Sequence, residues 1–323
     1  MDRQYDVATF GETMLRLSAP GYQSLEEAVS LDVRIGGAES NVAVALSRIG
    51  LKTTWWSRLP DNPLGRRIEN EIRRWGVDTS GVLWDESGET RAGLYFIDFA
   101  VPPRSTEVYY DRKCSSASYI SADQIDENII ASSRLLHLTG ITSALSGSCA
   151  DAIARAINLA KGSNTLVSFD TNYRSRLWNP ESARNALEPL LPQLDMLITP
   201  LQEAHLLFGI QGDGMEAASM LRARYSVNAV VVTCGSEGAI AVDDSGEYNA
   251  PPYNIPLIVD RIGAGDAFDA GMIAGFLQND LQLGLDTGMA MAALKHTIPG
   301  DLLLCTNAEI ESVRSGAHHS VRR

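Results

Sequence analysis

The chain has 323 residues and carries 27 basic against 40 acidic residues, which gives a formal net charge of −13. That length fits one large α/β domain with an appendage, or two domains. The negative charge argues against nucleic acid as a partner, because nucleic-acid phosphates are bound by basic surfaces. No apolar run reaches the roughly 18 residues of a membrane span, and the N-terminus lacks the apolar stretch of a secretory signal. We therefore expect a cytoplasmic protein with no membrane partner.

Cysteine and histidine spacing gives no sign of a zinc site. The four cysteines, Cys114, Cys149, Cys234 and Cys305, contain no CxxC pair. The five histidines show no ligand spacing either. The sequence therefore predicts reduced, structural thiols and no metal held by these side chains.

Short β-branched segments alternate with longer helical patterns along most of the chain. Strands are predicted at residues 5–11, 53–59, 134–140, 165–172, 194–200 and 229–235. Helices are predicted at residues 40–50, 63–75, 147–160, 181–191, 201–208 and 214–225, and again at 263–278 and 283–298. Because continuous apolar strands separated by helices are covered on both faces, this order predicts an α/β fold with a mainly parallel sheet sandwiched by helices.

Two segments, 12–36 and 91–113, interrupt this alternation with extended patterns and no helix. They predict a small, mostly antiparallel β-sheet lid over the strand ends, where parallel sheets bind ligands. Because the lid carries apolar residues such as Leu94, Phe96 and Ile97, we expect a homo-oligomer formed through it. The predicted division is an α/β core of residues 1–11, 37–90 and 114–315, a β lid of residues 12–36 and 91–113, and a loose tail of residues 316–323.

The string DRIGAGDAFDAG, residues 260–271, places three glycines around one aspartate at the start of an apolar helical pattern. The amides of Gly263, Ala264 and Gly265 can form an anion-holding nest, to which the helix N-terminus adds partial positive charge. Asp266 then falls in the first helical turn, where it can accept a proton from a substrate hydroxyl. This pairing predicts phosphoryl transfer, which needs a positioned base and stabilised oxygens. The alternative is a tight turn with an N-capping aspartate, and the string is neither a Walker loop nor a GxGxxG fingerprint.

Two further strings strengthen the case for phosphoryl transfer. RIGGAESNVAVALSRIG (34–50), VVTCGSEGA (231–239) and DRIGAGD (260–266), in this order, resemble the ribokinase-like, or PfkB-type, carbohydrate kinase family. The resemblance covers nearly the whole chain and implies an α/β kinase core with a β lid. FDTNYRSRLW (169–178), VYYDRK (108–113) and ALKHTIPGD (293–301) are most similar to family members that act on 2-keto-3-deoxygluconate. This implies phosphorylation of that acid's terminal hydroxyl to give 2-keto-3-deoxy-6-phosphogluconate, within an Entner–Doudoroff-type pathway.

The resemblance implies a role for each matching residue. Asp266 is the catalytic base beside an anion hole formed by residues 262–265. Arg112 is expected to hold the sugar-acid carboxylate, since planar arginine binds carboxylates bidentately. Arg174 lies near either that carboxylate or the nucleotide phosphates. The implied catalytic residues are Asp266, Gly263, Ala264 and Gly265. The implied sugar contacts are Glu12, Gly36, Gly37, Asn41, Tyr95, Tyr110, Arg112, Arg174 and Asp301. The implied nucleotide contacts are Asn172, Arg174, Thr233, Gly235, Gly238, Gly263 and Gly265.

The resemblance also implies ATP and Mg²⁺ as cofactors. Many members of the family carry an N-x-x-E motif that organises magnesium-bound water. Here the corresponding stretch is TPLQEAHLLFG, with Glu203 present and Pro200 at the position of the asparagine. Glu203 is therefore expected to act on the metal through water, without the usual asparagine. The need for Mg²⁺ to neutralise ATP is unaffected by this departure.

Several alternatives to this interpretation stay open. The same chemistry on another sugar would make the chain a fructokinase, a kinase tolerant of 2-keto-3-deoxygalactonate or a nucleoside kinase, although two arginines favour an acid. A catalytically silent sugar or nucleotide sensor is a second alternative, against which the intact turn around Asp266 argues. A NAD-dependent dehydrogenase is disfavoured because the first strand lacks the glycine fingerprint. The structural alternatives are Tyr95 and Tyr110 as lid aromatics, Arg112 in a surface ion pair, and Lys295 and His296 as helix caps.

Overall fold

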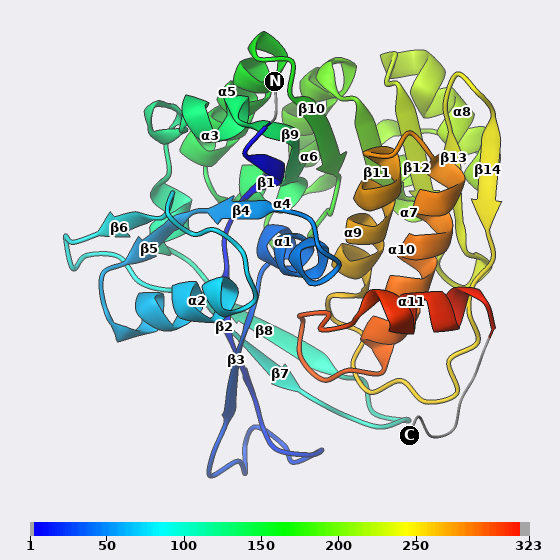
Figure 1. Ribbon diagram of the computed structural model, residues 1–323. Coiled ribbons are helices and arrows are strands. Elements are labelled where there is room, and N and C mark those ends of the chain that lie inside the picture. Colours follow the sequence, from blue (N-terminus) through cyan, green and yellow to red (C-terminus); the bar gives the residue numbers. More distant parts are fainter. Residues whose placement is uncertain (1–2, 317–323) are drawn as a thin grey trace.

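Figure 1 shows the computed structural model, which describes residues 3–316. Its core is an eight-stranded sheet with the order β14-β13-β12-β11-β10-β9-β1-β4. All neighbours from β4 to β12 run parallel, whereas β13 and β14 return antiparallel at one edge. The sequence predicted the parallel part and missed these two antiparallel strands. The strands are β1 (Tyr5–Phe10), β4 (Thr53–Trp56), β9 (Ser133–Thr139), β10 (Leu166–Asp170), β11 (Met196–Pro200), β12 (Ala229–Thr233), β13 (Ala239–Val242) and β14 (Glu247–Ala250).

Helices cover both faces of this sheet, as predicted. Successive strand residues point to opposite faces, so Leu135 belongs to one apolar cluster and Leu136 to the other. The Leu136 side packs under α3 (Glu127–Ala131), α5 (Gly147–Gly162), α6 (Pro180–Leu187), α7 (Leu201–Phe208) and α8 (Gly214–Tyr225). The Leu135 side packs under α1 (Ala38–Arg48), α9 (Ala264–Phe276), α10 (Leu281–His296) and α11 (Asn307–Arg314) (Figure 1). The remaining helical elements are α2 (Pro63–Arg74), α4 (Gly140–Leu145), η1 (Ser116–Tyr119), η2 (Ala122–Gln124), η3 (Glu188–Gln193) and η4 (Gly235–Glu237).

A four-stranded lid sheet with the order β3-β2-β7-β8 extends from the core (Figure 1). It consists of β2 (Met14–Ser18), β3 (Asp32–Gly36), β7 (Leu94–Asp98) and β8 (Glu107–Asp111). The pairs β2–β3 and β7–β8 are antiparallel, while β2 and β7 run parallel where the two lid segments meet. Ile97, which the sequence suggested as an exposed lid residue, is fully buried because it shares the inner face with Tyr95.

The predicted strand 53–59 is divided between two sheets. Trp55 and Trp56 stay buried in the core, but Arg58 turns away to form an ion pair with Asp85 at 3.0 Å. Its segment, β5 (Arg58–Pro60), pairs with β6 (Leu83–Asp85) instead. Of the predicted tail 316–323, residues 317–323 lie outside the described residues. Within residues 3–316, no helix is both long and apolar enough to cross a membrane.

Candidate active site

The glycine turn before α9 has the backbone geometry that an anion site needs. Gly263 has φ +85°, and a Cβ there would lie 2.2 Å from the Asp301 carbonyl oxygen, so this position excludes other residues. A Cβ at Gly265 would meet nothing within 4 Å, so packing does not explain that glycine. The amides of Gly265 and Asp266 have no hydrogen-bond partner in the described chain. Together with the α9 N-terminus they offer free donors to an anion.

Asp266 stands beside this turn and faces a cavity of about 370 Å³. The Asn41 side-chain amide donates a 2.6 Å hydrogen bond to its Oδ2. Burial raises the pKa of Asp266 to about 6, and the Asn41 hydrogen bond opposes that rise. The carboxylate is therefore ionised at neutral pH and more basic than an ordinary aspartate, as a general base should be.

The junction of β3 and α1 forms one wall of the same cavity, and its glycines bring three elements close together. A Cβ at Gly36 would lie 2.1 Å from the Tyr95 hydroxyl and 2.3 Å from Asp301 Oδ2. A Cβ at Gly37 would lie 2.3 Å from the Glu12 carbonyl oxygen. The structure thus brings these five sugar-contact candidates together at the cavity wall, while both glycines also have a packing role.

Arg112 and Glu12, both predicted as sugar contacts, form an ion pair with each other. The Arg112 guanidinium donates to Glu12 Oε2 through Nε at 2.8 Å and also through Nη2. Glu12 is buried, so this is not the surface ion pair considered as an alternative for Arg112. The pairing holds the guanidinium plane in one orientation, and its Nη1 has no hydrogen-bond partner in residues 3–316. Arg112 therefore reaches the cavity already oriented.

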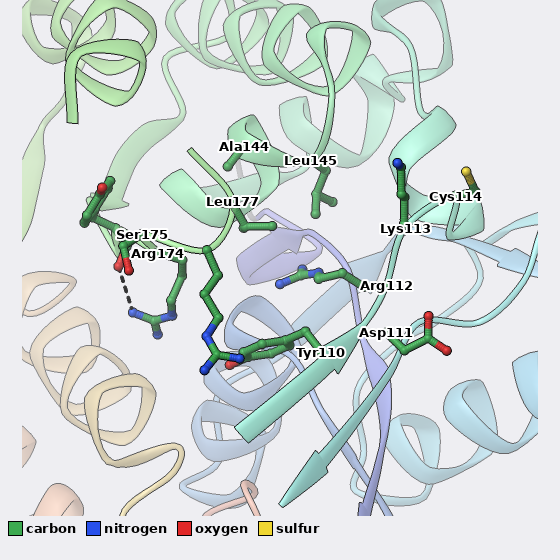
Figure 2. A pocket seen from close by; sticks show the side chains of 12 residues that line it. Tyr110, Asp111, Arg112, Lys113, Cys114, Ala144, Leu145, Arg174, Ser175 and Leu177 are labelled. Carbon is green, nitrogen blue, oxygen red and sulfur yellow. Dashed lines mark hydrogen bonds between the residues drawn. The ribbon is translucent and has the colours of Figure 1, made fainter. Parts of the chain in front are cut away.

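A wider cavity of about 770 Å³ adjoins this one between β8 and the loop after β10. Figure 2 shows Arg112 and Tyr110 extending into it from the lid, with Arg174 on the facing loop. Within residues 3–316, the Arg174 side chain donates only to the neighbouring Tyr173 carbonyl oxygen, at 3.3 Å. Tyr110, Arg112 and Arg174 line both cavities. Positive side chains thus gather where the two cavities join.

The carboxyl ends of β10 and β11 supply two acidic residues to the opposite wall. Glu203 Oε2 accepts hydrogen bonds from the Thr171 hydroxyl at 2.6 Å and the Tyr173 amide at 2.9 Å. Burial, and then the Glu203 charge, raise the pKa of Asp170 to about 8. Asn172, at φ +41°, donates its amide to Asp170 Oδ1. Asp170 is a cavity residue that the sequence analysis missed, although its string FDTN was singled out.

The residues predicted for the nucleotide divide into two groups. Asn172 and Arg174 line the sugar-side cavity, whereas Thr233, Gly235 and Gly238 lie outside both cavities. Thr233 pairs with Pro200 in the sheet register, so it lies at the same edge as β10 and β11. A Cβ at Gly238 would lie 2.1 Å from the Ala250 carbonyl oxygen. Packing against β14 therefore accounts for this glycine without a ligand.

Among the expected helix caps, Lys295 has a second, buried role. Its Nζ lies 3.0 Å from the Ile298 carbonyl oxygen and 3.5 Å from that of Asp260, and the residue has no exposed surface. His296 bonds the Ala292 carbonyl oxygen at 2.7 Å, within its own helix. Lys295 thus joins the end of α10 to the start of the glycine turn.

The structure has a β lid over the carboxyl edge of a parallel sheet. Under the lid, a carboxylate and free amides lie together at a helix N-terminus. This combination is typical of a ribokinase-like kinase. The model of the pfkB family of carbohydrate kinases matches residues 4–303. The chain belongs to this family and is a sugar kinase.

Similar proteins and solved structures match almost the whole chain and agree with this family assignment. The chain is 38% identical over 319 residues to a 2-dehydro-3-deoxygalactonokinase of Haloferax volcanii, covering 98% of this chain and 99% of that protein. It is 33% identical to a 2-dehydro-3-deoxygluconokinase of Thermoproteus tenax, with 91% and 89% covered. The crystal structure of a 2-dehydro-3-deoxygluconokinase from Thermotoga maritima superimposes with a TM-score of 0.91 at 32% identity, covering 98% of this chain and all of that one.

Proposed function

We propose that the protein transfers the γ-phosphoryl group of ATP to the terminal hydroxyl of 2-keto-3-deoxygluconate, giving 2-keto-3-deoxy-6-phosphogluconate. The observation that carries the proposal is one cavity that holds Asp266 beside free backbone amides and also contacts Arg112 and Arg174. The first feature suits transfer to an alcohol, and the second suits an acid. The product would belong to an Entner–Doudoroff-type route for sugar acids.

Asp266 would take the hydroxyl proton as the oxygen attacks phosphorus. Its raised pKa makes it a better proton acceptor than an ordinary aspartate, and Asn41 keeps its carboxylate in place. The amides at Gly265 and Asp266 would donate to the phosphoryl oxygens, where negative charge is spread during transfer. Positioning and electrostatic stabilisation are the two contributions that phosphoryl transfer requires.

The carboxylate of the substrate would lie where the two cavities join. Arg112 presents a free Nη1 there because Glu12 holds its other nitrogens, and Arg174 faces it from the β10 loop (Figure 2). Charge-assisted hydrogen bonds from guanidinium to carboxylate contribute about 1.5–3 kcal/mol each. A neutral sugar would forgo them, so this end of the cavity selects for acids.

The residues around the cavity fit ATP with Mg²⁺. The carboxylates of Asp170 and Glu203 line the cavity without a salt-bridge partner in the described residues. No three His, Cys, Asp or Glu side chains of residues 3–316 converge as a complete metal site. That donor set suits Mg²⁺, which keeps several waters and is held mainly by substrate phosphates. Glu203 would hold it through water and Asn172 would contact the nucleotide, while bound Mg²⁺ would neutralise phosphate charge.

An ADP-release assay over a panel of substrates tests this proposal. The panel contains 2-keto-3-deoxygluconate, its galactonate epimer, fructose and ribose, each with Mg²⁺ and ATP. We expect kcat/KM for the gluconate acid to exceed that for fructose by at least about tenfold, because two cations favour its carboxylate. Faster turnover of fructose would contradict the sugar-acid assignment. The galactonate epimer is the second candidate, because the 38% identical relative is named for it.

We also propose that the lid mediates homo-oligomer formation. On its outer face, Val33, Leu17, Phe96 and Tyr109 lie opposite one another across all four strands. Val33 is 38% exposed and Tyr109 is 49% exposed. A continuous apolar row on an open sheet is a surface that a second copy can cover. Replacing Val33 and Tyr109 with lysine should convert the oligomer to monomer in light scattering, and a wild-type monomer at all concentrations would refute the proposal.

A further inference from the structure

Arg16 is a buried arginine on the lid strand β2 that connects the lid to the glycine turn before α9. Its side chain is 2% exposed. Nη2 donates to Asp260 Oδ2 at 2.5 Å, and Nη1 donates to Asp301 Oδ1 at 2.6 Å. One planar guanidinium thus joins two carboxylates that precede and follow the helix pair α9–α10.

The two carboxylates hold different parts of the active site. Asp260 Oδ1 accepts the amide of Ile262, inside the glycine turn, at 3.1 Å. Asp260 Oδ2 accepts the amide of Gly300 at 2.9 Å. Asp301 borders the sugar-side cavity, and its backbone carbonyl packs against Gly263. A movement of the guanidinium would therefore reach both the anion hole and the sugar-binding wall.

Arg16 belongs to a buried group of four charged residues whose charges cancel. Two buried carboxylates, Asp260 and Asp301, face two buried cations, Arg16 and Lys295. Lys295 lies against the main-chain oxygen of Asp260, so it cannot replace the two side-chain contacts of Arg16. Arg16 reaches the two carboxylates with two separate nitrogens of a planar fork, whereas an ammonium has all three donors on one atom and would have to lie within reach of both carboxylates.

We propose that Arg16 is a positioning residue for phosphoryl transfer, which fixes the lid, the anion-hole turn and Asp301 in one arrangement. The inference rests on the kinase activity and on the proposed contact of Asp301 with the sugar. It does not depend on which sugar is the substrate. Arg16 lines neither of the two cavities proposed to hold the ligands, so its effect would pass through Asp260 and Asp301.

Arg16→Lys and Arg16→Ala test this role, with Arg34→Met as the matched control. Arg34 lies directly opposite Arg16 in the sheet register, but it is exposed. It lies against Gly300, and its one side-chain hydrogen bond within residues 3–316 goes to the Pro299 carbonyl oxygen, at 3.4 Å. Because misplacement of about 1 Å can cost roughly 10²-fold in rate, we expect kcat/KM for the sugar to fall by about that factor in both Arg16 variants. The KM for ATP should change by less than about threefold, and Arg34→Met should retain activity within about threefold.

Rescue by free guanidinium separates positioning from a merely structural role. Arg16 borders a cavity of about 240 Å³, through which a small cation can reach the space left by Arg16→Ala. Guanidinium chloride below denaturing concentration should raise kcat/KM of Arg16→Ala by at least about tenfold, since its fork restores both bridges. Methylammonium at equal ionic strength should not. Thermal unfolding of each variant reports stability independently of activity.

The outcomes distinguish this inference from the substrate proposal. Folded Arg16→Lys with kcat/KM within about threefold of wild type would overturn the positioning role. So would a loss in Arg16→Ala that guanidinium fails to reverse. If Arg16→Ala does not fold, Arg16→Lys decides the matter. All assays use the sugar that the wild-type enzyme phosphorylates fastest, so preference for a neutral sugar refutes the substrate and leaves this test intact.

Discussion

Replacing Asp266 with asparagine tests the central element of the proposed site. The side chain keeps its size, and Asn41 can still donate to the remaining oxygen, so the packing is preserved. What the substitution removes is the carboxylate that we propose accepts the proton of the sugar hydroxyl. Because a positioned base contributes roughly 10²–10⁴-fold, kcat should fall by at least about 10²-fold. The KM values for sugar and ATP should change by less than about threefold.

The same substitution should make the protein more stable above pH 6. Burial raises the pKa of Asp266 from 3.8 to about 6, so the folded state disfavours the charged form. The wild type therefore loses stability as the pH rises from the unfolded-state value through about 6, and Asp266→Asn does not. That increase in pKa corresponds to roughly 3 kcal/mol. Partial exposure of the side chain reduces the expected gain at pH 8 to about 1–2 kcal/mol.

Coupled ADP release and urea denaturation at pH 5 and pH 8 measure both effects. Asp269→Asn is the matched control, because Asp269 lies one turn further along α9 and outside both cavities. Burial and the nearby Asp170 charge raise its pKa well above the usual range, so asparagine imitates its neutral form. That variant should stay within about threefold of wild-type kcat. An Asp266→Asn enzyme that keeps more than about a tenth of wild-type kcat would refute the role of Asp266 as base.

Three further predictions concern the turn, the carboxylate site and pH. Gly263→Ala should lower activity by at least about 10²-fold and reduce the melting temperature, because its Cβ would meet the Asp301 backbone. Gly265→Ala should fold normally, because a Cβ there meets nothing. Equal melting temperatures of the two variants would contradict this prediction. Arg112→Met combined with Glu12→Gln, which avoids an unpaired buried carboxylate, should raise the sugar-acid KM by roughly 10–100-fold and leave fructose turnover little changed. A pH profile of kcat/KM should fall about tenfold per unit below pH 6, where Asp266 becomes protonated, and a flat profile there would exclude it as the base.

The sequence predicts those parts of the fold whose apolar residues recur at regular spacing within one segment. The alternation that sends Leu135 and Leu136 to opposite faces, repeated in each central strand, predicts a sheet covered on both sides. The strands β13 and β14 were missed because each has only four residues, and the edge strand β14 is mostly polar and exposed. Edge strands carry little of the apolar pattern on which prediction relies.

The glycine turn was predictable for a similar reason, since its geometry is a property of a few adjacent residues. The string GAGD places glycines where the turn needs a positive φ at Gly263, whereas the close contact of Gly263 with the Asp301 backbone is visible only in the structure. The pairing of Glu12 with Arg112 spans 100 positions, and that of Arg16 with Asp301 spans 285. No local pattern encodes such contacts. They arise only when the lid folds over the sheet, which is why Arg16 escaped sequence analysis.

Some carboxylates around the cavity have salt bridges and others do not, and from this difference we infer where the cation that accompanies the ligand binds. At the lid, Glu12 is neutralised by Arg112, while Arg16 and Lys295 neutralise the two carboxylates beneath it. Asp170 and Asp266, in contrast, have no salt bridge in residues 3–316, and burial raises the pKa of each. Asp269 and Glu39 are also buried without a salt bridge in these residues, but both lie outside the two cavities, whereas Asp170 and Asp266 line the sugar-side cavity. We propose that magnesium bound to ATP would supply positive charge beside these two carboxylates, at the nucleotide's end of the cavity, and that the oriented arginines would bind the substrate's carboxylate at the other end.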